Sequence, residues 1–115
     1  MVVHFLMIPA LKVAAAKALA LYKHYKAVKS AAQVFNWAMA HAQLAAIDAQ
    51  YKALRDLPME QRNPKYDLRK SESGGPAFRT AIRASAEACA AKDEAMFEMI
   101  MNKLAGDLAP HGLHC

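Results

Sequence analysis

The first 47 residues of this sequence contain no aspartate or glutamate, and all ten acidic residues follow that stretch. The same stretch carries five lysines and no arginine: Lys12, Lys17, Lys23, Lys26 and Lys29. A basic, acid-free, helix-forming N-terminus is typical of mitochondrial and plastid targeting segments, although those use arginine more often. Two other interpretations stay open, which are a solvated basic helix face and a nucleic-acid contact.

Glycine and proline are absent from residues 10–57, so nothing in this stretch requires the backbone to turn. The stretch is rich in Ala, Leu, Lys and Gln, which are strong helix formers. It therefore predicts one continuous helix over residues 10–57, with a length of roughly 70 Å.

Cysteine is also scarce, with Cys89 and Cys115 as the only two in the chain. They form no Cys-x-x-Cys pair, which excludes a disulfide framework and a cysteine zinc site. A reducing compartment fits this usage.

The rest of the chain is divided by its prolines and glycines. Residues 1–9 form a short apolar segment, and residues 58–75 form a long polar loop. A second helix is predicted over 76–105, followed by a tail over 106–115. The prediction is an all-α single domain over 1–115. Its long N-terminal helix and shorter C-terminal helix form an extended helical hairpin joined by the polar loop.

Residues 2–22 are hydrophobic enough to raise the question of a membrane span. Lys12 and Lys17 would lie near the middle of such a span, where each costs about 2.5–3.5 kcal/mol. We therefore expect peripheral contact with lipid, or with a groove on a partner, in place of a span.

Two apolar stripes run along residues 10–57, and the second is rotated relative to the first. The second comprises Leu44, Ile47, Tyr51 and Leu54, which are predicted to pack on Phe78, Ile82, Cys89 and Met96. A second helix of 30 residues covers only part of the first, so the N-terminal half is expected to need other protein subunits as cover. The expected partner-interface residues are Phe5, Leu21, Val28, Phe35, Trp37, Met39, Tyr66, Met99 and Met101.

No catalytic motif is present, and we expect neither enzymatic activity nor a bound cofactor. Two features favour the opposite view. Asp93 falls on the apolar face predicted for the second helix, where a carboxylate must be paired or neutral. His111, His114 and Cys115 offer three possible metal ligands in what is otherwise a flexible tail.

These features favour a non-catalytic structural accessory subunit of a large mitochondrial inner-membrane assembly. Such an assembly would be a respiratory-chain complex or the ATP synthase, with the chain on the matrix side bracing its neighbours. The alternative is a basic helical module that binds RNA or DNA through the lysines, which is disfavoured because Lys17 points away from the other four. A small enzyme or cofactor carrier is the third hypothesis.

Overall fold

The computed structural model describes residues 2–67 and 76–113, with side chains over residues 12–67 and 77–113. The all-α prediction is confirmed, because the described residues contain helices and no strand. The four α-helices are α1 (Val2–Gln33), α2 (Trp37–Arg55), α3 (Pro76–Ala91) and α4 (Glu94–Leu108). Three short 3-10 turns accompany them: η1 (Met59–Gln61), η2 (Pro64–Tyr66) and η4 (Ala109–His111).

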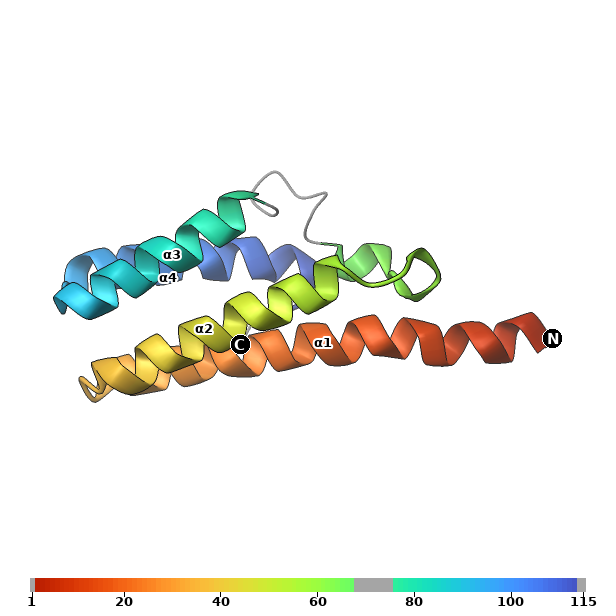
Figure 1. Cartoon of the computed structure of the whole chain (residues 1–115), viewed down its shortest axis with the longest axis horizontal. Helices are drawn as coiled ribbons and strands as arrows, with labels where there is room; N and C mark the ends of the chain where they lie inside the picture. The colour runs from red at the N-terminus through yellow and green to blue at the C-terminus, as the bar shows by residue number, and fades with distance from the viewer. Residues whose placement is uncertain (1, 68–75, 114–115) are drawn as a thin grey trace.

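The helices form two antiparallel hairpins, and the hairpins are stacked through α2 and α3 (Figure 1). The molecule measures 54 × 25 × 22 Å along its principal axes. The turn between α1 and α2 and the turn between α3 and α4 lie at the same end (Figure 1). At the opposite end, the N-terminal part of α1 extends beyond the other helices (Figure 1).

The first hairpin is held by two matching apolar stripes. Buried side chains recur alternately four and three residues apart on both helices, which places them on one face. On α1 they are Ala14, Ala18, Leu21, Tyr25 and Val28, and on α2 they are Ala40, Leu44, Ile47, Tyr51 and Leu54. The alanines let the two backbones approach closely. A hydrogen bond of 2.6 Å between His24 Nδ1 and Gln43 Oε1 sets the register of the pair.

The second hairpin closes the core from the other side of α2. Phe78 on α3 stacks on Tyr51 with ring centroids 5.1 Å apart. Arg79 Nε donates to Asp48 Oδ1 at 3.2 Å, which adds a partly buried ion pair between α2 and α3. The Tyr51–Phe78 contact agrees with the prediction that the stripe with Tyr51 packs on Phe78.

The turn after α1 is a Schellman motif, the hydrogen-bonded arrangement that commonly ends helices. The N–H of Phe35 donates to the carbonyl of Ala32, and the N–H of Asn36 donates to that of Ala31, both at 2.9 Å. Phe35 has φ of 57°, in the left-handed region that usually takes glycine. Asn36 then caps α2, because its side chain accepts from the N–H of Met39 at 3.1 Å.

The turn after α3 repeats this design. Lys92 takes the left-handed position with φ of 55°. The N–H of Asp93 donates to the carbonyl of Ala88 at 2.9 Å, and the Asp93 side chain accepts from the N–H of Met96 at 3.1 Å. In each turn, one residue ends the Schellman motif and caps the next helix, so both reversals take only two or three residues.

The predicted continuous helix over residues 10–57 is wrong. The chain reverses at residues 34–36, because Phe35 adopts the left-handed conformation without a glycine and Asn36 supplies the cap. The rotation between the two apolar stripes marks this break, and each stripe belongs to a separate helix.

Other predicted boundaries also need correction. The second helix over 76–105 is two helices, divided at Lys92 and Asp93. The tail over 106–115 begins as helix, because α4 continues to Leu108 and η4 follows it. The apolar segment over 1–9 is not separate, since α1 begins at Val2 and continues through Pro9; a proline removes one backbone hydrogen bond without excluding helical dihedral angles. The predicted loop over 58–75 contains η1 and η2, and residues 68–75 lie outside the described residues.

The fold also removes one argument for a partner. The first apolar stripe was expected to need foreign subunits as cover, but α2 and the α3–α4 hairpin bury it within the chain. A partner is therefore not required to cover Leu21 or Val28, which are both fully buried.

Replacing Phe35 with glycine tests the strained turn. We expect Phe35→Gly to raise the free energy of unfolding by about 0.5–1 kcal/mol, because glycine adopts positive φ freely. The phenyl ring contributes little in return, since Phe35 is 63% exposed. Gln33→Gly, at the exposed last residue of α1, is the control and is expected to lower it by about 0.5–1 kcal/mol. Urea denaturation measures both, and equal losses would contradict the turn geometry.

Candidate protein-binding groove

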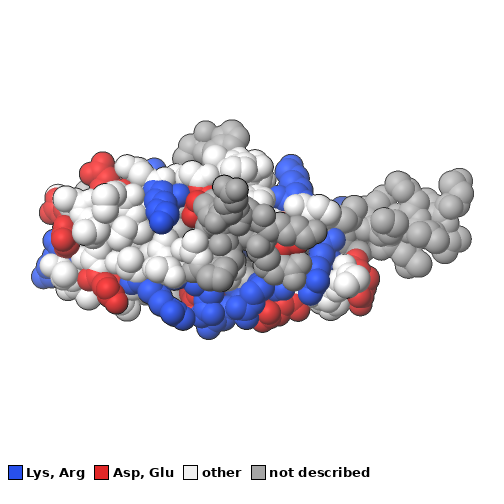
Figure 2. All heavy atoms as spheres, turned by 90° about the horizontal axis from the view of Figure 1, so that it is seen from above, with Lys and Arg blue, Asp and Glu red and all other residues white. Residues whose placement is uncertain are grey.

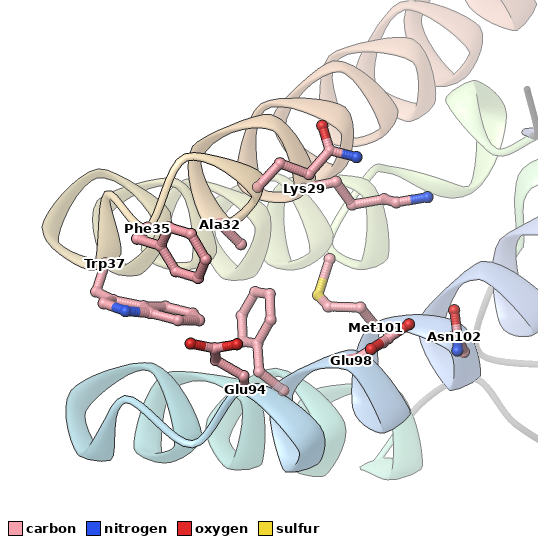
Figure 3. A pocket seen from close by; sticks show the side chains of 10 residues that line it. Lys29, Ala32, Phe35, Trp37, Glu94, Glu98, Met101 and Asn102 are labelled. Carbon is pink, nitrogen blue, oxygen red and sulfur yellow. The ribbon is translucent and has the colours of Figure 1, made fainter.

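A groove lies between the end of α1, the turn at Phe35 and the first turns of α4 (Figure 3). Its volume is about 430 Å³. Ten residues line it: Lys29, Ala32 and Gln33 from α1, Phe35 and Trp37 from the turn and α2, and Glu94, Phe97, Glu98, Met101 and Asn102 from α4. The groove is open to solvent on one side.

One end of the groove is aromatic. The Trp37 and Phe97 rings meet edge to face, with centroids 5.4 Å apart and an angle of 80° between the planes. Phe97 is buried, Trp37 is partly buried, and Phe35 remains largely exposed beside them. Behind this wall, the Cys89 thiol donates to the carbonyl of Trp37 at 3.4 Å, which fixes the start of α2 against α3.

The α4 side of the groove also carries two acidic residues, on either side of Phe97 in the sequence. Glu94 and Glu98 lie one turn apart on α4, and both are exposed. Neither forms an ion pair or a hydrogen bond within the described residues. Like charges at this spacing repel each other by a few tenths of a kcal/mol. The α4 N-terminus partly offsets the cost for Glu94, since the helix dipole favours negative charge there.

The basic residue of the groove, Lys29, forms no ion pair with these carboxylates within the described residues. The Lys29 ammonium lies 5.8 Å from the centroid of the Tyr25 ring, in a cation–π contact along α1. Its side chain extends away from Trp37 (Figure 3). The Tyr25 hydroxyl donates to the carbonyl of Met101 at 3.3 Å, which ties α1 to α4 and closes the deep end.

The structure separates the residues predicted as a partner interface. Phe35, Met39 and Met99 are exposed, at 63%, 49% and 60%. Trp37 and Tyr66 are partly buried against the core, so the expected fully exposed tryptophan is not found. Leu21, Val28 and Met101 are core residues of this chain, which corrects their assignment to a partner surface. The side chain of Phe5 lies outside the described residues.

The groove itself unites Phe35, Trp37 and Met101 from that set with Phe97, Glu94 and Glu98. No pattern in the sequence connected Glu94 and Glu98 with Trp37. The connection depends on the reversal at Phe35, which a continuous helix does not contain. The pattern that marks both turns is an Asn or Asp followed two residues later by Ala-Met, at Asn36 and at Asp93.

The prediction of a buried Asp93 carboxylate is wrong. Asp93 is exposed and caps α4, which explains an acidic residue in an apolar stretch without invoking a proton site. Its side chain satisfies a free backbone N–H at the helix start.

The predicted tail metal ligands are divided by the structure. His111 is buried at the end of η4, where its Nδ1 donates to the carbonyl of Lys65 at 2.6 Å. Its Nε2 and Oδ2 of Asp107 are buried atoms that find no hydrogen-bond partner among the described residues. His114 and Cys115 lie outside the described residues. Over the described part of the chain, no three His, Cys, Asp or Glu residues gather as a metal site requires.

Cys89 lies in the core between α3 and α2, at 1% exposure. Burial raises the pKa of its thiol, because the thiolate would lose its hydration. The thiol therefore stays protonated and packs as a small apolar group at neutral pH.

Comparisons with known proteins found no matching family model, curated protein or solved structure. Within the described residues, no helix combines the length and the apolar character that crossing a membrane requires. The groove and the acid-free, basic N-terminal residues are the features that indicate a function.

Trp37 is the only tryptophan of the chain, so its fluorescence reports on the groove directly. We expect Phe97→Ala to lower the free energy of unfolding by about 3–5 kcal/mol, because it leaves a cavity under the aromatic wall. The folded variant should also show Trp37 emission shifted to longer wavelength, since water reaches the indole. Met99→Ala, at an exposed position, should change stability by less than about 0.5 kcal/mol. An unchanged emission spectrum in Phe97→Ala would contradict this packing.

Proposed function

We propose that this chain is a non-catalytic accessory subunit that binds a neighbouring protein through the groove at Phe35. The assembly is proposed to be a large complex of the mitochondrial inner membrane, either a respiratory-chain complex or the ATP synthase. The chain would lie on the matrix side and brace neighbouring subunits, with its N-terminal segment near the lipid surface.

The observation that carries the binding proposal is the conformation of Phe35. A bulky residue with positive φ is strained by about 1–3 kcal/mol, and such strain is concentrated at functional sites. Glycine or asparagine would fill this turn position at lower cost. The ring returns little of that cost by packing, since it is 63% exposed at the groove rim. An aromatic side chain held open in this way suits contact with a partner.

Methionines near the two turns support the same interpretation. Met39 lies three residues after the first turn, and Met96 and Met99 follow the second turn. All three are substantially exposed, from 44% to 60%. Methionine side chains are flexible and polarizable, so they adapt to an irregular partner surface.

The mitochondrial part of the proposal depends on charge. The helix α1 contains no acidic residue, and Lys12, Lys23 and Lys26 are exposed on it. Mitochondrial import signals are basic, acid-poor and helical, which is the pattern of this helix.

The alternative, a helical RNA- or DNA-binding module, is supported by the same exposed lysines. Figure 2 shows Lys and Arg gathered along one long edge of the molecule, with acidic residues interspersed. Phosphate binding favours a continuous basic surface. Because acidic residues interrupt this one, nucleic-acid binding is the second candidate, after the accessory-subunit function. Binding of a fluorescent RNA or DNA at low salt, lost steeply as salt rises, would favour it over the accessory-subunit proposal.

Import followed by native electrophoresis tests the proposed function. The radiolabelled chain is incubated with isolated energised mitochondria, which are then treated with protease, solubilised in mild detergent and separated. We expect a protease-protected chain that migrates with a respiratory complex or the ATP synthase. Phe35→Asn should import equally but migrate mainly as free protein, because asparagine tolerates positive φ and lacks the ring.

Leu19→Asn is the matched control, since Leu19 is an exposed apolar residue of α1 outside the groove. It should import and co-migrate like the unaltered chain. Absence of import, or migration of the unaltered chain as a free protein, would contradict the proposal. Equal loss of co-migration in Phe35→Asn and Leu19→Asn would show that the groove is not the binding site.

A further inference from the structure

The two carboxylates of the groove have no cation of their own within the described residues. Lys29 is the one basic residue among the residues that line the groove, and its ammonium lies over Tyr25. Two carboxylates that flank Phe97 on α4, with Glu94 beside Trp37, are therefore left without an ion-pair partner within the described residues, in a chain of net charge +5 (Figure 3).

We propose that the groove receives a lysine or arginine side chain that projects from the apolar face of a partner helix. This inference rests on the proposed function, in which the groove binds a protein, and it names the chemistry of that partner. The partner residue would place its aliphatic stem along Trp37 and Phe97 and its charged end at Glu94 and Glu98.

The aromatic wall suits the stem and the charge. Lysine and arginine bury their methylene groups on apolar surfaces while the charged end stays near solvent. Tryptophan is also the best aromatic partner for a cation. The Phe35, Trp37 and Glu94 side chains all project into the space between the turn and α4 (Figure 3).

The two carboxylates gain from a cation in two ways. A positive charge near Glu94 or Glu98 forms an ion pair with that carboxylate and reduces the repulsion between the two. Because the groove is open on one side, each pair is screened by water and contributes modestly. Affinity would therefore come mainly from the apolar contacts, and the carboxylates would select for positive charge.

The groove is large enough for a long side chain and for part of what flanks it. Its volume is about 430 Å³. The open side lets a helix lie across the groove and insert one long residue. The exposed Phe35 and the neighbouring Met39, Met96 and Met99 would then meet the apolar residues that flank the cation.

Trp37 fluorescence measures this preference in the pure, full-length chain. The probe is hexylguanidinium, with hexanol and hexanoate at the same concentrations as neutral and anionic controls. We expect a saturable change in Trp37 emission with hexylguanidinium, a weaker one with hexanol and none with hexanoate. Circular dichroism at each concentration shows that the chain stays folded.

Neutral replacements of the carboxylates separate charge from apolar binding. Glu94→Gln and Glu98→Gln should each weaken hexylguanidinium binding about two- to five-fold and leave hexanol binding unchanged. Glu87→Gln is the matched control, because Glu87 is an exposed acidic residue on α3 outside the groove. Equal binding of the cation and the alcohol, or equal effects of all three replacements, would overturn the proposal. Concentration-dependent dimerisation that blocks the probe would assign the groove to a second copy and also overturn it.

The native-gel assay distinguishes failure of this inference from failure of the proposed function. The double variant Glu94→Gln/Glu98→Gln should co-migrate with the assembly less than the unaltered chain does, with a larger free fraction. If the double variant co-migrates normally while Phe35→Asn does not, the groove binds a protein but not through a cation. If the unaltered chain itself does not co-migrate, the proposed function fails.

Discussion

The reversal of the chain at Phe35 determines everything else in this structure. Two backbone hydrogen bonds end α1, and the Asn36 side chain starts α2 immediately afterwards. Because the turn is so short, α2 must lie antiparallel on α1, and the two apolar stripes meet along their whole length. A second turn of the same kind, at Lys92 and Asp93, places α4 antiparallel to α3. The core therefore lies within two helical hairpins with the same kind of turn, packed together through α2 and α3.

The fold class could be predicted from the sequence, whereas the topology could not. Helix propensity and the absence of β-branched runs were sufficient for an all-α assignment. The break at residues 34–36 was missed because Phe35 occupies a position where glycine is expected, so the usual stop signal is absent. The information was nevertheless present in two places. The apolar stripe changes phase between Val28 and Leu44, and Asn36 is a strong N-cap residue followed by a regular amphipathic pattern.

The groove could be predicted only in part for the same reason. Phe35, Met39 and Met99 were recognised as apolar residues that face outward, and the structure leaves them exposed. Trp37 was predicted only as part of a partner interface along a continuous helix. In the folded chain, it contacts Phe97, which is 60 residues away in sequence. Glu94 and Glu98 line the same groove as Trp37 only because that tertiary contact packs α4 against the turn. Among the described residues, the core is buried without a partner, and the groove with the aromatic rim stays open to solvent.

The distance between α1 and α2 tests the reversal most directly. Spin labels at Ala16→Cys and Lys52→Cys, both exposed positions, are introduced in a chain that carries Cys89→Ala and Cys115→Ser. A continuous helix would place these sites about 54 Å apart, at 1.5 Å per residue. The register set by His24 and Gln43 places them at the same level of adjacent helices, so the account predicts a single narrow distribution well below half that value. A distribution centred near the straight-helix distance would contradict the turn, the groove and the functions proposed for it.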